Sequence, residues 1–240
     1  MADESTRPAE MTDDMRMKFN AVSTATLAGQ MQRRGSRNSF LNGLKPLNEG
    51  QRMLGYAHTL RYVPRREDFE RRSEGPNAQR RAVESIEPES ILICEAREEP
   101  HAGTIGDIFT MRIKSRGATG FVTDGALRDT PAIAEIDFPV YHQSSHAATL
   151  GRIHTPLDHQ IPIACAGVTV FPGDILVGDG EGVVVIPALL AEEVANDAYQ
   201  QELEEEWAIE RVAAGESSIG TFPIADDRRA EFEEWLANRG

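Results

Sequence analysis

Two short polar segments of the chain carry residue types that could bind an anion beside a metal ion. The first is GDIF, Gly106 to Phe109, and the second is Arg128-Asp129, which ends the stretch DGALRD. Exposed N–H groups at the beginning of a helix attract carboxylates and phosphates, and a guanidinium can hold an anionic oxygen group through two hydrogen bonds. Carboxylates are hard oxygen ligands that suit Mg²⁺. Together these residues could bind an anionic substrate next to a divalent cation.

The segments on either side of GDIF predict how these residues would be positioned. Residues 90–96 (SILICEA) and 118–123 (ATGFVT) are short apolar runs typical of buried strands. Residues 106–117 between them predict a helix. Arg128-Asp129 would then lie just beyond the carboxyl end of a strand, which is the edge where α/β sheets bind ligands. The two polar segments flank one strand–helix–strand unit, so we expect them to lie side by side.

Further local expectations concern single residues of this unit. In the helix, Ile108, Met111 and Ile113 are expected to face inward, and Asp124 and Gly125 are expected to form a turn that ends the second strand. Spacing alone also permits a structural interpretation, in which Asp107 caps the helix and Arg128-Asp129 is a surface pair. Since most paired charges are structural, that interpretation is favoured until another observation is added.

The rest of the chain predicts an α/β fold with mixed parallel and antiparallel strands. Residues 52–63 and 138–142 read as further strands, and residues 130–136 as a helix capped by Thr130, which suggests a parallel layer with right-handed crossovers. Other segments predict an antiparallel meander (161–187), a long acidic helix (187–215) and a charged loop or lid-like insertion (64–81). Residues 1–17 are expected to be a disordered or loosely attached arm, residues 18–220 one domain, and residues 221–240 a helical tail.

Composition excludes some classes of function. The net charge is −14 with a pI near 4.9, and the arginine pairs are scattered among acids, so we expect no nucleic-acid partner. Cys94 and Cys165 lie in apolar runs and are expected to be buried free thiols in a reducing compartment. The N-terminal segment lacks the apolar stretch of a signal peptide, and no run is long enough to span a membrane. We therefore expect a cytoplasmic protein.

Four histidines lie close together in the sequence, His142, His146, His154 and His159. Their spacing matches no common zinc site, and no cysteine joins them. We expect them to form a polar wall of the substrate pocket rather than a metal site.

The sequence resembles the RraA-like family, which includes pyruvate aldolases acting on 4-hydroxy-4-methyl-2-oxoglutarate and 4-carboxy-4-hydroxy-2-oxoadipate. The resemblance covers about residues 20–220 and includes VSTATLAGQMQRRG, LKPLNEGQRMLGYAHTLRY, FPVY and RVAAGES. The sharpest match is Asp107, then the twenty residues 108–127, then Arg128-Asp129. This spacing is that of the aldolase-competent members.

The resemblance implies a β/β/α swivelling-type fold, a homotrimer or hexamer with sites between subunits, and a divalent metal, Mg²⁺ or Mn²⁺. It implies that Asp129 holds the metal with support from Asp107, and that Arg128 binds the keto and carboxylate end of a 2-oxo acid. The backbone amides of Gly106, Asp107, Ile108 and Phe109 would hold that carboxylate. A glutamate of a neighbouring subunit's long helix would reach the metal, either Glu205 or Glu206, and Arg152 would meet the distal carboxylate of the substrate.

The function implied by this resemblance is that of a metal-dependent carbon–carbon lyase, an aldolase and decarboxylase. It would cleave a 4-hydroxy-2-oxo acid or diacid to pyruvate and decarboxylate oxaloacetate, because both reactions pass through the pyruvate enolate. Two alternatives remain: a non-enzymatic regulator that binds ribonuclease E, as the founding member of the family does, and a related lyase or hydratase acting on a sugar-acid intermediate.

Overall fold

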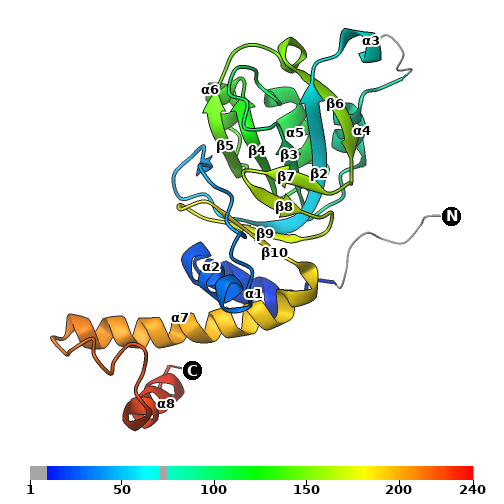
Figure 1. The fold of residues 1–240 in the computed structure, drawn as a ribbon. Coiled ribbons are helices and arrows are strands. Elements are labelled where there is room, and N and C mark those ends of the chain that lie inside the picture. The colour runs from blue at the N-terminus through cyan, green and yellow to red at the C-terminus, as the bar shows by residue number, and fades with distance from the viewer. Residues whose placement is uncertain (1–9, 71–74, 240) are drawn as a thin grey trace.

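The parallel centre of the main sheet has the strand–helix alternation expected from the sequence. The structure is a computed structural model that describes residues 10–70 and 75–239. Strands β2, β3, β4 and β5 are parallel neighbours (Figure 1). Strands β3 and β4 are almost wholly buried, whereas β5 is buried over its first two residues. Helices α4, α5 and α6 lie between them in the chain. The bounds of these elements are β2 (Met53–Pro64), α4 (Ala78–Ser85), β3 (Ser90–Glu95), α5 (Asp107–Ser115), β4 (Gly120–Leu127), α6 (Thr130–Ala134) and β5 (Val140–Ser145).

Antiparallel strands complete the eight-stranded sheet, whose order is β1-β5-β4-β3-β2-β9-β10 with β6 paired to the far end of β2. The hairpin β9–β10 turns at 179–182, the DGEG segment, and β7 and β8 form a separate two-stranded ribbon over the sheet. The mixed α/β fold predicted from the sequence is therefore confirmed. The remaining strands are β1 (Lys45–Pro46), β6 (His154–His159), β7 (Ile163–Cys165), β8 (Val168–Val170), β9 (Ile175–Gly178) and β10 (Val183–Ile186).

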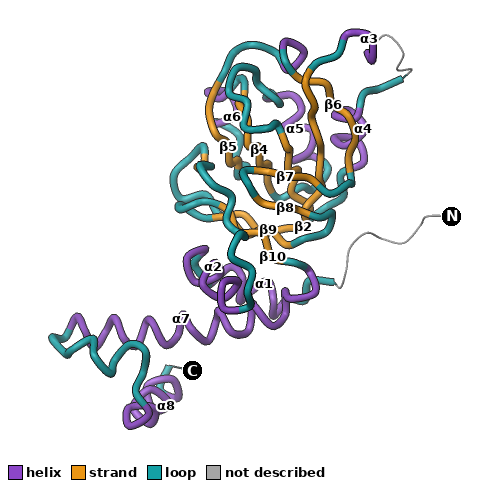
Figure 2. The backbone as a smooth tube through the Cα atoms, viewed as in Figure 1, coloured by secondary structure: helices purple, strands orange, loops and turns teal. Residues whose placement is uncertain are grey.

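A second helical layer covers the β9–β10 end of the sheet (Figures 1 and 2). Helices α1 and α2 and the first half of α7 pack there, while the second half of α7 extends away from the sheet and carries α8. The bounds of the remaining helices are α1 (Asp13–Ala21), α2 (Thr24–Arg33), α3 (Glu67–Glu70), α7 (Ala191–Ala213) and α8 (Arg229–Ala237). Short 3₁₀ turns lie at Leu150–Arg152, Ala188–Leu190 and Asp226–Arg228.

The expected arm over residues 1–17 is wrong where the structure describes it. Thr12 caps α1 by accepting a hydrogen bond from the N–H of Met15, and Met11, Met15 and Phe19 are buried against the β9–β10 layer. Asp13 and Asp14 occupy the first turn of the helix, where negative charge is favourable, so they start a helix rather than a loose arm. Residues 1–9 lie outside the described part of the chain.

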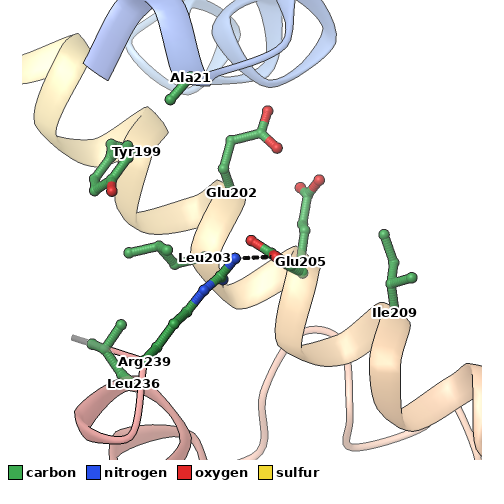
Figure 3. Close-up of a pocket in the computed structure, with 9 residues that line it drawn as sticks. Ala21, Tyr199, Glu202, Leu203, Glu205, Ile209, Leu236 and Arg239 are labelled. Atoms are coloured by element: carbon green, nitrogen blue, oxygen red, sulfur yellow. Dashed lines mark hydrogen bonds and ion pairs between the residues drawn. The ribbon is translucent and has the colours of Figure 1, made fainter. Parts of the chain in front are cut away.

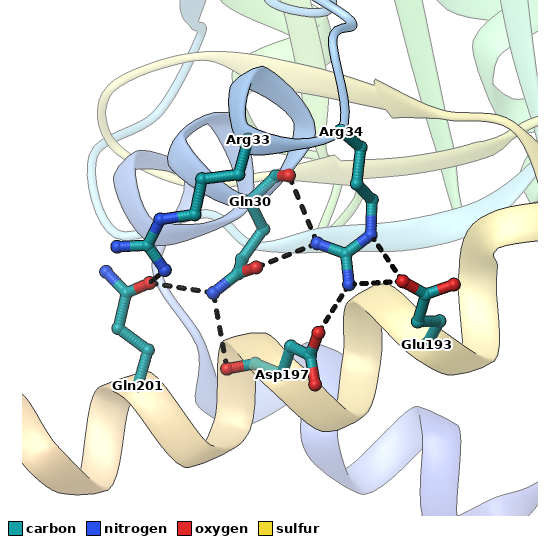
Figure 4. Close-up of polar contacts among 6 residues, drawn as sticks. All are labelled: Gln30, Arg33, Arg34, Glu193, Asp197 and Gln201. Carbon is teal, nitrogen blue, oxygen red and sulfur yellow. Dashed lines mark hydrogen bonds and ion pairs between the residues drawn. The ribbon is translucent and has the colours of Figure 1, made fainter.

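An arginine joins α2 to the first half of α7 (Figure 4). The Nε atom of Arg34 lies 3.1 Å from Glu193, and another nitrogen of the same guanidinium donates to Asp197 one turn further along α7. Gln30 contributes a hydrogen bond of 2.8 Å to Gln201. These contacts, together with the apolar layer beneath them, hold the start of α7 on the body of the protein.

The expected turn at Asp124 and Gly125 is also wrong, because both residues lie inside β4 and are buried. The register between β4 and β5 shifts between Thr123 and Ala126, which marks an irregularity in the ladder. The carboxylate of Asp124 accepts hydrogen bonds from the N–H groups of Ala96 and Ala166. Its polar partners are thus backbone amides of the interior, which a local sequence pattern does not reveal.

No helix in the described part of the chain is long and apolar enough to cross a bilayer.

Buried His58 gives the stability of the fold a predictable dependence on pH. His58 lies in β2, stacks on His159 at 5.8 Å between ring centres, and is only 4% exposed. Burial, with a smaller contribution from His159, lowers the pKa of His58 from 6.5 to about 4. Between these two values the unfolded chain binds a proton that the folded chain does not, so stability is lost as the pH falls.

We expect the His58→Leu variant to lose less stability than the wild type when the pH falls from about 7 to about 5. The difference should be roughly 2 kcal/mol in the free energy of unfolding, since the unfolded state no longer gains a proton at this position. Urea denaturation at both pH values measures it. Parallel losses in the two proteins would contradict the assignment.

Candidate functional site

A pocket of about 430 Å³ lies where the helices α4 and α5 meet the carboxyl ends of the strands. Its walls come from four parts of the chain that are far apart in sequence. The lining residues are Gln79, Arg80, Gly103, Thr104, Ile105, Gly106, Asp107, Ile108, Phe109, Arg128, Asp129, Thr149 and Leu150. The structure therefore brings the two polar segments singled out in the sequence into one pocket.

Backbone hydrogen bonds hold these two segments side by side. The N–H of Arg128 donates to the carbonyl of Ile105 at 3.1 Å, and the N–H of Thr104 donates to the carbonyl of Ala126 at 2.8 Å. The loop before α5 thus continues the ladder of β4 beyond its regular pairing with β3. The juxtaposition does not depend on flexible side chains.

The first wall of the pocket is the beginning of α5. Gly106 occupies the N-cap position without a side-chain cap, and Asp107 is the first helical residue. The Asp107 carboxylate turns back to accept a hydrogen bond of 2.7 Å from the N–H of Ile108. The other N–H groups of this first turn have no partner within the helix, so they add positive potential to this side of the pocket.

The second wall is the pair Arg128 and Asp129. The Nε atom of Arg128 donates to Oδ2 of Asp129 at 3.0 Å, and each side chain is about one third exposed (36% and 35%). Because the ion pair uses Nε, the two terminal nitrogens of the guanidinium are left for a ligand. Asp129 has a left-handed backbone with φ of 58° and precedes α6. It occupies the N-cap position predicted for Thr130, which is instead the first helical residue, so that prediction is wrong.

Two glycines leave the room that the pair occupies. A Cβ atom on Gly106 would lie 2.5 Å from Oδ2 of Asp129, and one on Gly103 would lie 2.6 Å from Cβ of Arg128. Real Cβ atoms are essentially never found at such distances. Any other residue at either position would displace the ion pair.

The donor set at this pocket fits a hard divalent cation. Asp107 and Asp129 are the two carboxylates of the lining, and among the described residues no group of three or more His, Cys, Asp or Glu side chains could hold a metal. Mg²⁺ is commonly held by one or two carboxylates and completes its shell with water and substrate oxygens. Two half-exposed carboxylates beside an anion-binding helix start are compatible with that mode.

Other predicted site residues do not reach this pocket within one chain. Arg152 is exposed in the 3₁₀ turn after Leu150 and is absent from the lining. Glu205 and Glu206 lie on α7 in a different pocket (Figure 3), where Glu206 pairs with Arg239 and Glu205 accepts a hydrogen bond from Gln201. Their participation through a neighbouring subunit stays a prediction.

The predicted histidine wall is wrong, because none of the four histidines lines the pocket. His154 is buried within hydrogen-bonding distance of Arg97, and His159 stacks on His58 beside β2. The rings of His154 and His159 therefore pack between strands.

The inward orientation predicted for two residues of α5 is also wrong. Ile108 is 78% exposed and Met111 is 50% exposed, while Ile113 is fully buried as predicted. The helix packs through Thr110 and Ile113, with Phe109 partly buried against the same core. Ile108 therefore stands at the edge of the pocket instead of in the core.

The sequence analysis missed the residues contributed by α4. Gln79 is buried and donates a hydrogen bond of 2.6 Å to the carbonyl of Thr104, which fixes the start of α4 to the floor of the pocket. A local signal was available, since Asn77 caps this helix by accepting from the N–H of Arg80. Capping predicts where the helix begins but not that its first turn faces the pocket.

Comparison with known proteins agrees with this geometry. A family model described as RraA-like, Aldolase/RraA, matches residues 24–185, which is more than half of the chain. The chain belongs to the RraA-like family. The matched range includes every residue that lines the pocket.

Individual relatives extend the comparison beyond the family match. A protein of Halalkalibacterium halodurans named "Putative 4-hydroxy-4-methyl-2-oxoglutarate aldolase" is 28% identical over 199 residues, covering 80% of this chain and 86% of that protein. The crystal structure of Streptomyces coelicolor RraAS2, described as an unusual member of the RNase ES inhibitor RraA protein family, is 30% identical with a TM-score of 0.76. It covers 84% of this chain and 97% of RraAS2. An uncharacterized Pseudomonas syringae protein shares the fold, with a TM-score of 0.77 at 23% identity over 89% of this chain and 99% of that one.

We expect the Gly106→Ala variant to bind Mg²⁺ at least tenfold more weakly than the wild type, because the added methyl group would push Asp129 away from Arg128. Isothermal titration with Mg²⁺ measures this change. Gly29→Ala is the matched control, since its added Cβ meets nothing within 4 Å. Equal weakening in both variants, or in neither, would contradict the predicted role of this glycine.

Proposed function

We propose that this pocket is the active site of a divalent-metal-dependent lyase that cleaves a 4-hydroxy-2-oxo acid to pyruvate and also decarboxylates oxaloacetate. The observation that carries the proposal is the meeting of Asp107, Arg128 and Asp129 at the start of α5. Family membership supports an aldolase or an RraA-type regulator, and these three residues favour the enzyme.

The metal would be Mg²⁺ or Mn²⁺, held by Asp129 with support from Asp107. A cation held there would withdraw electron density from the carbonyl group of a 2-oxo acid. The ion pair of Asp129 with Arg128 keeps this carboxylate in place before a ligand arrives.

Arg128 and the first turn of α5 would orient the substrate. The free terminal nitrogens of Arg128 can donate to the keto and carboxylate oxygens, and the N–H groups of the helix start can hold the other carboxylate oxygen. This clamp would place the C3–C4 bond inside the pocket with the substrate's C4 end toward the opening.

Cleavage then proceeds by a balanced movement of electrons. The C4 hydroxyl gives its proton to water and becomes a carbonyl, the C3–C4 bond breaks, and its electron pair passes into the enolate of pyruvate, which then takes a proton from water at C3. Arg128 lies where this negative charge develops, so it would stabilise the transition state more than the ground state. Loss of CO₂ from oxaloacetate leaves the same enolate, which is why one pocket can catalyse both reactions.

We further propose that the active assembly is a homotrimer, or a hexamer built from two trimers. The second half of α7 extends from the body of the protein (Figure 1), and Glu205 and Glu206 lie on it. A neighbouring copy could therefore receive one of these carboxylates near its metal.

The test of the lyase is a coupled assay for pyruvate release from oxaloacetate and from 4-hydroxy-4-methyl-2-oxoglutarate, with Mg²⁺ and with EDTA. We expect release that EDTA abolishes, and a loss of at least about 100-fold in kcat for Arg128→Lys, because lysine cannot reproduce the bidentate fork. Arg112→Lys is the control, since Arg112 pairs with Glu84 on the surface outside the pocket. Absence of pyruvate from both substrates in the presence of metal would refute the proposal.

A second candidate function is protein binding, because the solved structure at 30% identity is described as belonging to the RNase ES inhibitor RraA family. Inhibition of an RNase E-type enzyme by the wild type and equally by Arg128→Lys, without pyruvate release, would favour this function over the lyase.

A further inference from the structure

The pocket contains a second guanidinium that the proposed chemistry does not use. Arg80 lies in the first turn of α4 and lines the same pocket as Arg128 and the start of α5. Its guanidinium carbon lies 5.9 Å from the centre of the Phe109 ring, so the cation lies over the first turn of α5. Arg80 therefore reaches the pocket from α4, whereas Arg128 reaches it from the segment after β4.

Among the described residues, Arg80 has no paired carboxylate, unlike Arg81 and Arg112. One turn further along the same two helices, Glu84 of α4 pairs with Arg112 of α5 at 2.6 Å. Arg80 and Phe109 are the corresponding contact one turn nearer the pocket, and there no carboxylate is paired with the arginine in residues 10–70 and 75–239. Arg80 is exposed, so water solvates its charge in the free protein.

The helix that carries Arg80 is held firmly at this end. The side chain of Asn77 accepts from the N–H of Arg80 at 3.0 Å, and the buried Gln79 side chain donates to the carbonyl of Thr104 at 2.6 Å. The backbone of Arg80 is therefore fixed relative to the floor of the pocket. An arginine held this way loses less entropy on binding than one on a mobile loop.

We propose that Arg80 binds the distal carboxylate of the substrate and selects dicarboxylic over monocarboxylic 2-oxo acids. This proposal rests on the proposed function. Arg128 would take the keto and carboxylate end, while Arg80, which reaches the same pocket from α4, binds the second carboxylate. This assigns to Arg80 the role that sequence resemblance gave to Arg152, which does not line the pocket.

The charge of the protein makes this selection physically meaningful. With a net charge of −14, the chain as a whole repels dianions, so a diacid needs a local positive site to bind. Two arginines that line one pocket from different elements supply that site. A monocarboxylic acid would leave Arg80 solvated, without cost or gain.

The binding test uses two 2-oxo acids of equal chain length, 2-oxoglutarate and 2-oxopentanoate, titrated into the protein with Mg²⁺ present. We expect the wild type to bind 2-oxoglutarate about tenfold more tightly, the Arg80→Met variant to lose this preference, and Arg80→Glu to reverse it. Arg81→Met is the matched control, because Arg81 contacts Pro76 and Asp158 and lies outside the pocket lining. It should retain the preference.

Several outcomes would overturn the assignment of Arg80. These are no preference in the wild type, no binding of either acid, equal loss of both acids in Arg80→Met, or the same loss in Arg81→Met. Circular dichroism checks that each variant is folded.

The same variants separate this inference from the lyase proposal in the pyruvate assay. For Arg80→Met we expect KM for 4-hydroxy-4-methyl-2-oxoglutarate to rise about tenfold with little change in kcat, since the distal carboxylate of this substrate keeps its charge during cleavage and the arginine binds the ground state and the transition state equally. A carboxylate preference without pyruvate release would refute the lyase but keep Arg80 as a recognition residue. Pyruvate release with unchanged KM in Arg80→Met would refute only the role of Arg80.

Discussion

The edge of the sheet that carries the pocket depends on the hydrogen bonds that the buried carboxylate of Asp124 accepts. This carboxylate sits in the middle of β4 and accepts hydrogen bonds from the N–H groups of Ala96, at the end of β3, and Ala166, between β7 and β8. Burial raises the pKa of Asp124 to about 6, while the backbone amides that donate to it favour the charged form. The side chain of Asp124 thereby replaces the backbone hydrogen bonds of the ladder at the point where the strands diverge. From there the chain turns toward Gly103 and Gly106.

Much of the fold and the pocket could be predicted because the signals were local. Apolar runs predicted β3 and the beginning of β4, and the spacing of Asp107 from Arg128-Asp129 placed them one strand–helix–strand unit apart. Adjacent parallel strands end at the same edge, so the meeting of these residues follows from topology alone. Their chemical roles do not follow from topology, and the spacing permits a surface ion pair equally well.

The remaining features depend on contacts between distant segments. Aspartate is common in turns, but Asp124 lies in a strand, because its hydrogen-bond partners are 28 and 42 residues away in the sequence. Isoleucine is typical of protein cores, but Ile108 faces the pocket, because Thr110 and Ile113 already fill the space beneath α5. The contribution of α4 was missed because the charged segment before it resembled a loop, and only the packing of Gln79 on Thr104 shows which way its first turn faces.

The two glycines beneath the Arg128-Asp129 pair have a consequence for how such a pocket can diversify. At Gly103 and Gly106 the backbone lies directly against Arg128 and Asp129, at distances where not even a methyl group can be added. On α4, by contrast, Arg80 is exposed and lies over the Phe109 ring, so its side chain can be exchanged without disturbing the core. If the pocket acts as proposed, a change of substrate preference would arise more readily on that helix than at the two glycines.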